Sequence, residues 1–324
     1  MLCVIAGHLG VTQVNSLVFS FHMPLFFIIS GYLYMPRKAS LLKRKFKHLI
    51  LPYFFTCFLI ILLSLLANML DGQYNLILEN ICSLVLSSLY GSGSRQIYSL
   101  GVGAIGAIWF LWALFWASLV YEIIHDNRCV WLIAAILFVL SYGTSKFIWL
   151  PLSLFSGMSA VLFLHVGQTM KKYNLFGDRN AILTFLICTI VWICSLYFDH
   201  GQYMSMSRCD CPNALNEIAG AIAGTCVVII ASKKLYLSRF KWISSVLEKY
   251  GRYSLIVLCF HLVELNCFPW DEILNLLNVS ETVSRILILY IMKVVWSVFA
   301  IIIVVHIPLL ASIYGVKKQV NICA

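Results

Sequence analysis

The chain has 324 residues, of which 61% are hydrophobic and only 11% are charged, and its mean hydropathy is +0.91. A soluble domain of this length cannot bury so much apolar surface, so the composition excludes a soluble protein and predicts a multi-pass membrane protein. The net charge of +10 would suggest a nucleic-acid partner if the basic residues formed one patch. Their placement along the chain, described below, excludes that class.

Apolar segments alternate with short polar breaks along the whole chain. They predict an all-α, polytopic bundle of about ten transmembrane helices that forms one integral-membrane domain over residues 1–324. Residues 76–90 are apolar but are interrupted by Glu79 and Asn80, so we expect a re-entrant or interfacial segment there. The predicted spans lie at residues 1–10, 18–35, 49–70, 104–124, 129–143, 150–170, 181–198, 214–232, 253–270 and 284–312.

The basic residues are concentrated in alternate loops between the predicted spans. Those loops hold 18 of the 23 Lys and Arg, and an excess of positive charge is typical of the cytoplasmic side of a membrane protein. We therefore expect both termini in the cytoplasm and no nucleic-acid partner. The basic residues of these loops are Arg37, Lys38, Lys43, Arg44, Lys45, Lys47, Arg128, Lys171, Lys172, Arg179, Lys233, Lys234, Arg239, Lys241, Lys249, Arg252, Lys317 and Lys318.

The first predicted span is short. From Met1 to Gly10 a helix rises about 15 Å, which is half of a hydrocarbon core roughly 30 Å thick. We expect either that the first helix lacks its beginning in this chain or that the start codon has been placed too late. His8 lies on this helix.

Twelve cysteines are scattered, mostly one per apolar segment, which is typical of small buried hydrophobic residues rather than of a disulfide framework. The one close pair, Cys209 and Cys211, has a single residue between its members. That spacing strains a disulfide and is narrower than the usual zinc pairs, so we expect no metal. In the same outer loop, Asp199, His200 and Asp210 either contact a hydroxyl-rich acceptor or are simply solvated.

Two histidines stand near the outer ends of the first two predicted spans. His8 and His22 are joined by the short link 11–18, so their helices are expected to be neighbours. An ionisable group in an apolar segment often marks function, and imidazole suits a general base that takes a proton from a hydroxyl. The alternative is a pair of histidines that are hydrogen-bonded within the bundle. Ser30 and Gly31, further along the second span, permit the close approach of another helix.

Arg44 and Lys47 precede the third predicted span, at its cytoplasmic entrance. Basic side chains there either bind the phosphates of a nucleotide-bearing donor or anchor the helix at lipid headgroups. Trp109 opens an aromatic-rich stretch near the outer boundary, with Trp112 and Trp116. Such a stretch forms either an interfacial belt or a platform for a sugar ring.

His261 and Glu264 are three residues apart on the ninth predicted span and therefore share one face of a helix. A His–Glu pair inside a membrane span indicates a polar cavity or a proton path, unless the two groups only satisfy each other. Lys293, in the tenth span, is a possible partner for Glu264.

Taken together, these segments resemble the integral-membrane acyltransferase family 3, and in particular its fucose 4-O-acetylase-like branch. The second matching segment is the most specific one, and the likeness covers nearly the whole chain. The matching segments are Gly7-His8, Phe21-His22-Met23-Pro24-Leu25-Phe26-Phe27 with Ser30-Gly31, the basic stretch ending in Pro52-Tyr53, Trp109-Phe110-Leu111, Pro151–Gly167 with Lys171, and Gly251-x-x-Ser254 followed by His261.

The resemblance implies an enzyme that moves an acyl group, usually acetyl, from cytoplasmic acetyl-CoA to a hydroxyl of an envelope sugar or polysaccharide in the bacterial inner membrane. By this likeness His8 corresponds to the catalytic histidine, and we expect His22 to assist it. Arg44 and Lys47 match the family's basic motif and would bind the coenzyme A co-substrate. Trp109, His261 and Glu264 are expected to contact the carbohydrate acceptor. The family carries a basic residue upstream of its histidine, and this chain begins after that point.

Two other functions stay open on the sequence. A proton-coupled transporter or glycan exporter would use His261, Glu264 and Lys293 as a proton relay, but no convincing internal repeat supports it. An inactive, truncated family member is the other alternative. The sequence predicts membrane lipids as the surroundings and leaves the acceptor, the acyl chain and the oligomeric state undetermined.

Overall fold

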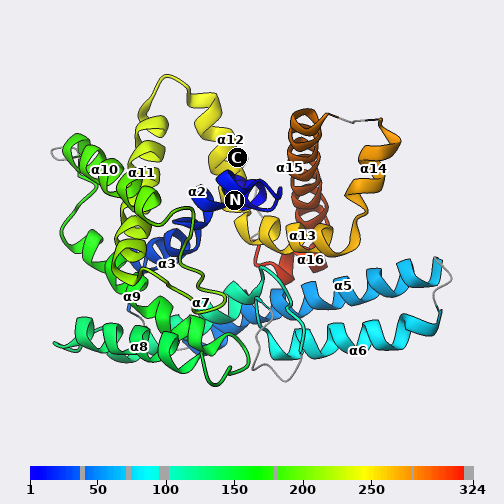
Figure 1. Cartoon of the computed structure of the whole chain (residues 1–324), viewed down its shortest axis with the longest axis horizontal. Helices are drawn as coiled ribbons and strands as arrows, with labels where there is room; N and C mark the ends of the chain where they lie inside the picture. Colours follow the sequence, from blue (N-terminus) through cyan, green and yellow to red (C-terminus); the bar gives the residue numbers. More distant parts are fainter. Residues whose placement is uncertain (37–40, 71–73, 95–101, 178–180, 279–280, 317–324) are drawn as a thin grey trace, which may run out of the picture.

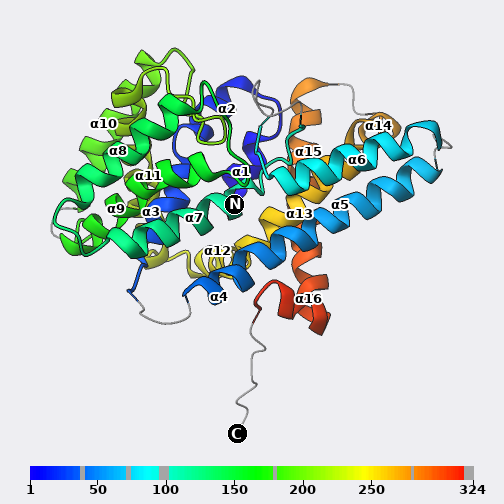
Figure 2. The same cartoon turned by 90° about the horizontal axis from the view of Figure 1, so that it is seen from below.

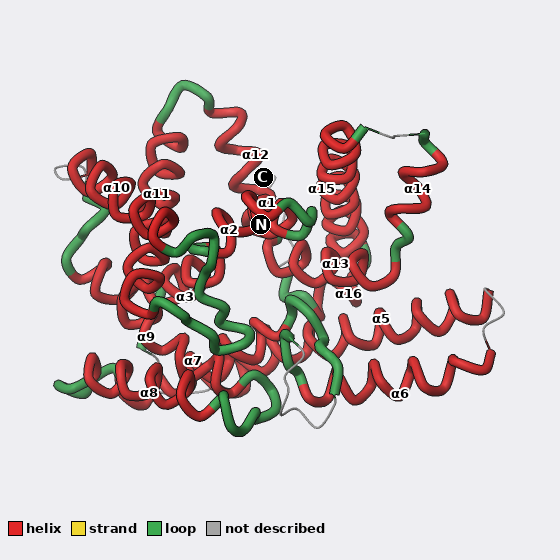
Figure 3. The backbone as a smooth tube through the Cα atoms, viewed as in Figure 1, coloured by secondary structure: helices red, strands yellow, loops and turns green. Residues whose placement is uncertain are grey.

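The computed structural model describes residues 1–36, 41–70, 74–94, 102–177, 181–278 and 281–316. In these ranges the chain is helical, and its one pairing of extended backbone is an isolated bridge between Ser205 and Asp210 (Figure 3). The elements, in chain order, are α1 (Leu2–Gly7), α2 (Thr12–Phe19), α3 (His22–Tyr32), α4 (Leu41–Lys45), the π-helical turn η1 (Phe46–Ile50), α5 (Leu51–Leu70), α6 (Tyr74–Tyr90), α7 (Trp109–Ile124), α8 (Val130–Thr144), α9 (Leu154–Lys172), α10 (Ala181–Phe198), α11 (Ala214–Leu237), α12 (Lys241–Arg252), α13 (Ser254–Cys267), α14 (Trp270–Leu276), α15 (Thr282–His306) and α16 (Pro308–Ile313).

Five helical stretches of the described residues are long and apolar enough to cross a membrane, or six if the bent pair α13–α14 is one span. The helical class of the prediction is confirmed, and the chain is a helical membrane protein. The count of about ten spans and the cytoplasmic termini are not confirmed and stay predictions. The five stretches are Thr12–Tyr32, Leu42–Leu70, Ala181–Phe198, Ala214–Leu237 and Thr282–His306.

The structure has fewer candidate spans than the ten predicted, because several of the predicted spans contain only short helices. The expected first span contains only the six-residue α1, and α7 and α8 have 16 and 15 residues. The link 11–18, expected to join two spans, is itself mostly the helix α2, which continues into α3 as one candidate span. Of the basic residues used for orientation, Arg37, Lys38, Arg179, Lys317 and Lys318 lie outside the described residues.

The outer surface agrees with a lipid environment. Helix α10 exposes large apolar side chains along its length, among them Leu186, Ile190 and Ile193. Water would disfavour so continuous an apolar face, whereas lipid tails do not. Helix α10 is therefore held only along one side, mainly by α11.

The helices form two groups, which Figures 1 and 2 show from two directions. One group contains α3 and α7 to α11, and the other contains α5, α6 and α13 to α15. Helix α1 lies between the groups, because it contacts α2 on one side and α15 on the other. The junction of the two groups therefore holds the first histidine of the sequence.

Helix α3 packs directly on the backbone of α9, and two glycines make this possible. A Cβ at Gly31 would lie 1.9 Å from the carbonyl oxygen of Leu164, and a Cβ at Gly167 would lie 1.9 Å from that of Ile28. No other residue fits at either position without separating the helices. The close approach expected from Ser30 and Gly31 is confirmed, and it fixes α3, which carries His22.

The basic segment enters α5 through a π-helical turn rather than a regular α-helix. The N–H of Leu51 bonds to the carbonyl oxygen of Phe46, five residues back. Pro52 follows at once and has no N–H to donate to the carbonyl of His48, so the regular pattern is interrupted here. Lys47 therefore lies on the widened turn, and Leu49 two residues later is buried.

Candidate active site

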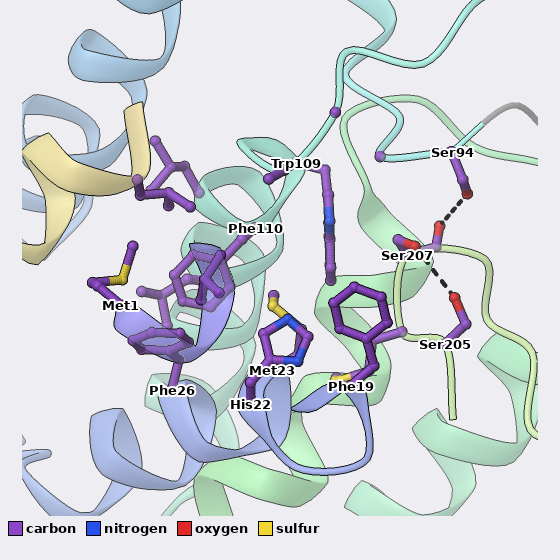
Figure 4. Close-up of a pocket in the computed structure, with 18 of the residues that line it drawn as sticks. Met1, Phe19, His22, Met23, Phe26, Ser94, Trp109, Phe110, Ser205 and Ser207 are labelled. Atoms are coloured by element: carbon purple, nitrogen blue, oxygen red, sulfur yellow. Dashed lines mark hydrogen bonds between the residues drawn. The ribbon is translucent and has the colours of Figure 1, made fainter. Parts of the chain in front are cut away.

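A cavity of about 560 Å³ lies at the junction of the two helix groups (Figure 4). It is lined by residues of α1 to α3, η1, α7 and α13 and of the loops that precede α7 and α11. The lining residues are Met1, Val4, His8, Phe19, His22, Met23, Phe26, Ile29, Ser30, Leu49, Gly93, Ser94, Gly106, Ala107, Trp109, Phe110, Leu111, Leu114, Tyr203, Met204, Ser205, Met206, Ser207, Arg208, Ser254, Leu255 and Leu258.

His8 is accessible from this cavity. It caps the C-terminus of α1, and its side chain is exposed although it lies inside the bundle. The ring packs against Phe19, with centroids 5.8 Å apart, and against His261, with centroids 5.3 Å apart. Gly7 makes this packing possible, because a Cβ there would lie 2.5 Å from the Phe19 ring. Glycine is thus favoured before His8, because a side chain at position 7 would collide with the Phe19 ring.

His22 lies on the same cavity wall and has a fixed orientation. It is the first residue of α3, and its Nδ1 lies 3.0 Å from the carbonyl oxygen of Val18. The carbonyl can only accept, so Nδ1 carries the proton in the neutral ring and Nε2 is left as an acceptor. The ring also packs on Phe19, at a centroid distance of 5.0 Å. Both predicted histidines therefore flank one phenylalanine and line one cavity.

His261 and Glu264 lie behind His8 rather than in the cavity. The Nδ1 atom of His261 is 2.7 Å from Oε1 of Glu264, and Nζ of Lys293 is 3.1 Å from the same oxygen. The side chains of all three are at most 3% exposed. The Trp270 indole N–H donates to the other carboxylate oxygen, Oε2. The expected partner Lys293 is thus found, and Trp270 is a further partner.

The surroundings of Glu264 determine which nitrogen of His261 carries its proton. The carboxylate accepts hydrogen bonds from Lys293 and Trp270, so it also accepts from His261 Nδ1–H. Nε2 of His261 then holds the lone pair, and it is buried without a hydrogen-bond partner. A buried acceptor of this kind has a free-energy cost unless a partner reaches it during function.

Trp109 lies at the cavity wall and is nearly buried. Its indole packs closely against Gly93, where a Cβ would lie 2.1 Å from the ring. In the view of Figure 4 the ring is seen edge-on and points down from its helix. Gly93 thus covers part of the Trp109 indole, and only the uncovered part of the ring is open to the cavity.

Arg44 and Lys47 do not line the cavity. Arg44, on α4, is half-buried, and Lys47, on η1, is exposed. The same turn supplies Leu49, which does line the cavity. The basic residues are therefore close in sequence to one lining residue but are not part of the described lining.

The loop between α10 and α11 contributes to the cavity through residues that the sequence analysis did not single out. Tyr203 to Arg208 all line the cavity, whereas Asp199, His200 and Asp210 do not. Asp199 is buried and accepts hydrogen bonds from Asn216 at 2.7 Å and from Asn213 at 3.2 Å. Its role is to tie the loop to α11.

The cavity is apolar on one side and polar on the other. In the view of Figure 4, Met1 and Phe26 lie to one side of His22, and Ser94, Ser205 and Ser207 lie to the other. The described lining contains two histidines and Arg208 but no carboxylate. Among the described residues, no group of three or more His, Cys, Asp or Glu could hold a metal ion. The imidazoles of this largely apolar cavity are thus suited to acid–base chemistry.

Comparison with known protein families matches residues 1–313 to the acyltransferase 3 family, whose description is an acyltransferase domain. No significant match was found among curated proteins or among solved structures. Because the family match covers nearly the whole sequence, the chain belongs to the acyltransferase 3 family. It is a multi-pass membrane acyltransferase, and the fucose 4-O-acetylase-like branch stays a prediction.

Proposed function

We propose that this protein is a membrane O-acyltransferase of the bacterial inner membrane. It moves an acetyl group from cytoplasmic acetyl-CoA to a hydroxyl of an envelope sugar or polysaccharide. The observation that carries the proposal is the placement of His8, which is open to the cavity while its ring rests on the buried His261–Glu264 pair.

His8 is the general base in this mechanism. The acceptor hydroxyl attacks the thioester carbonyl carbon and gives its proton to the His8 imidazole, so that a tetrahedral intermediate forms. The carbon–sulfur bond then breaks, and the coenzyme A thiolate leaves and takes the proton from the imidazolium. The acetyl ester and the free thiol are the products, and His8 returns to its starting state.

His261 and Glu264 act through His8 in this proposal. The sequence suggested that they contact the acceptor, but neither lines the cavity and both are buried. They are positioning residues, because the ring of His261 supports that of His8 and Glu264 fixes His261.

In this proposal the two sides of the cavity bind different substrates, the acetyl-CoA donor and the sugar acceptor. The apolar side, with Phe26 and Phe110, excludes water and so protects the thioester from hydrolysis. The basic residues Arg44 and Lys47 precede Leu49 in the segment that enters α5, on the expected cytoplasmic side, where they would attract the phosphates of coenzyme A. His22, with Nε2 as an acceptor, would hold the sugar hydroxyl beside His8.

The proposal is tested in cells by measuring the O-acetyl content of envelope glycans by mass spectrometry. We expect His8→Ala to abolish the acetyl groups that the wild-type chain adds, with normal amounts of protein in the membrane. The control is His306→Ala, since His306 lies exposed at the end of α15, outside the cavity lining, and its ring bonds to the carbonyl of Ile302. Undiminished acetyl content in His8→Ala would overturn the proposal.

A further inference from the structure

The turn at residues 205–210 is firmly anchored in the bundle. Ser205 and Asp210 form two backbone hydrogen bonds, of 2.8 and 3.1 Å, which close the turn. Met204, Met206 and Cys209 are each at most 3% exposed, so their side chains fix the turn in the core. Burial raises the pKa of the Cys209 thiol to about 12, so the thiol stays neutral and serves as an apolar anchor.

The anchored turn presents polar groups to the cavity. Arg208 Nε donates to Ser205 Oγ at 3.2 Å, which orients the guanidinium along the turn. Ser94 Oγ donates to the carbonyl of Ser207 at 3.1 Å, which joins the turn to the loop before α7 (Figure 4). The polar wall is therefore built before any ligand arrives, as binding sites usually are.

The charge of Arg208 is not balanced by the protein around it. In the part of the chain that the structure describes, no carboxylate lies within ion-pair distance of this guanidinium, and no other Lys or Arg lines the cavity. Asp199, the buried carboxylate of the same loop, is already bonded to Asn213 and Asn216. The guanidinium uses Nε for Ser205 and keeps its two terminal nitrogens, a geometry that fits a carboxylate or phosphate through two parallel hydrogen bonds.

We propose that Arg208, together with the hydroxyls of Ser205 and Ser207, binds an anionic group of the acceptor. The acceptor is then an acidic saccharide, with a carboxylate or a phosphate near the hydroxyl that is acetylated. This inference rests on the proposed function, because it assigns the acceptor end of the same cavity. It also explains why the described lining combines one arginine with hydroxyls and no carboxylate side chain, a set that attracts an anion.

The competing source of an anion is coenzyme A itself, whose phosphates could reach Arg208 if the donor entered from this side. The two sources predict different kinetics. If Arg208 binds the acceptor, its loss raises the KM of the acidic acceptor and leaves the KM of acetyl-CoA unchanged. If Arg208 binds the donor, its loss raises the KM of acetyl-CoA with every acceptor.

The test uses the full chain in phospholipid nanodiscs with radiolabelled acetyl-CoA and three probes of one ring type. The probes are methyl glucoside, methyl glucuronide and methyl glucoside 6-phosphate, which separate a neutral ring from a carboxylate and from a phosphate. We expect one of the acidic probes to exceed the neutral one in kcat/KM by at least about tenfold. Arg208→Gln should remove that preference through KM, and Arg208→Lys should keep part of it.

Lys146→Gln is the matched control, because Lys146 is also an exposed basic residue but lies outside the cavity lining. It should leave the preference unchanged. Three outcomes would overturn the inference and leave the proposed function standing. They are transfer without any preference for acidic probes, a preference that survives in Arg208→Gln, and a raised KM for acetyl-CoA in that variant. Absence of transfer to every probe also overturns the inference, whereas the proposed function is overturned separately, by undiminished envelope acetylation in His8→Ala.

Discussion

The ring of His8 packs on the ring of His261, with centroids 5.3 Å apart, although the two residues are 253 positions apart in the sequence. One ring faces the cavity and the other is buried with Glu264, Lys293 and Trp270 behind it. This contact links the first helix to α13. The Gly7-His8 segment and the His261–Glu264 pair, which are separate in the sequence, therefore form one candidate catalytic unit.

The positioning role of Glu264 predicts a selective loss of kcat. In Glu264→Gln the amide is neutral and has a different preference for donors and acceptors, so His261 is no longer fixed with Nδ1 protonated. We expect kcat to fall by roughly 10- to 100-fold with the KM of acetyl-CoA unchanged, as for other residues that orient a functional histidine. Steady-state kinetics of the purified protein measures both constants.

The control for this variant is Glu248→Gln. Glu248 forms an exposed ion pair with Arg252 on α12, at 3.2 Å, and does not line the cavity. It should behave as the wild type. A Glu264→Gln variant that keeps full kcat, or that loses activity only through KM, would contradict the positioning role.

Lys293 is predicted to matter for stability as well as for function. Lys293→Met leaves the Glu264 carboxylate buried without its cation, and breaking a buried pair costs about 3–5 kcal/mol. We expect a clearly lowered Tm in detergent. Combining Lys293→Met with Glu264→Leu removes both charges and should restore much of the stability but not the activity. A double variant that regains activity would show that the pair serves packing alone.

The basic segment is predicted to affect the donor only. Replacement of both Arg44 and Lys47 by Gln should raise the KM for acetyl-CoA at least about tenfold, because a charge-assisted hydrogen bond contributes about 1.5–3 kcal/mol. The KM of the acceptor should not change. Lys249→Gln, which removes an exposed positive charge from α12, is the control. An unchanged KM for acetyl-CoA in the double variant would support the lipid-anchor role instead.

The contact between α3 and α9 predicts a steric effect of a single methyl group. Gly31→Ala places a Cβ against the carbonyl of Leu164 and must separate the helices, at a cost of about 1–3 kcal/mol or more. Gly143→Ala is the matched control, since a Cβ there meets nothing within 4 Å. Thermal unfolding in detergent should show a lower Tm for Gly31→Ala only. Equal Tm values for both variants would contradict the packing described here.

Much of the helical fold follows from the sequence, because uninterrupted apolar segments such as 181–198 can only satisfy their backbone in lipid as helices. The number of spans does not follow so directly. Helices α7 and α8 are apolar enough for lipid but short, and apolarity alone does not separate a short span from a buried helix. The 70° bend between α13 and α14 has a local signal in Pro269, although the apolar segment 253–270 by itself predicts one continuous span.

The candidate site was predictable where a residue type is rare in its surroundings. His8 and His22 stand out in apolar segments, and both line the cavity, as does Trp109 from the aromatic-rich stretch. The positions of Arg208 and Trp270 depend on tertiary contacts instead, namely on the anchored turn at 205–210 and on the bend before α14. Neither contact has a periodic signal in the sequence, so no pattern could have placed these side chains.

The most direct test of the central claim is the rate of acetyl transfer by purified wild-type and His8→Ala proteins in nanodiscs, with acetyl-CoA at saturation. The account predicts that His8→Ala loses at least about 100-fold in kcat, the usual contribution of a general base, while acetyl-CoA still binds with wild-type affinity. Transfer at the wild-type rate by His8→Ala would contradict it.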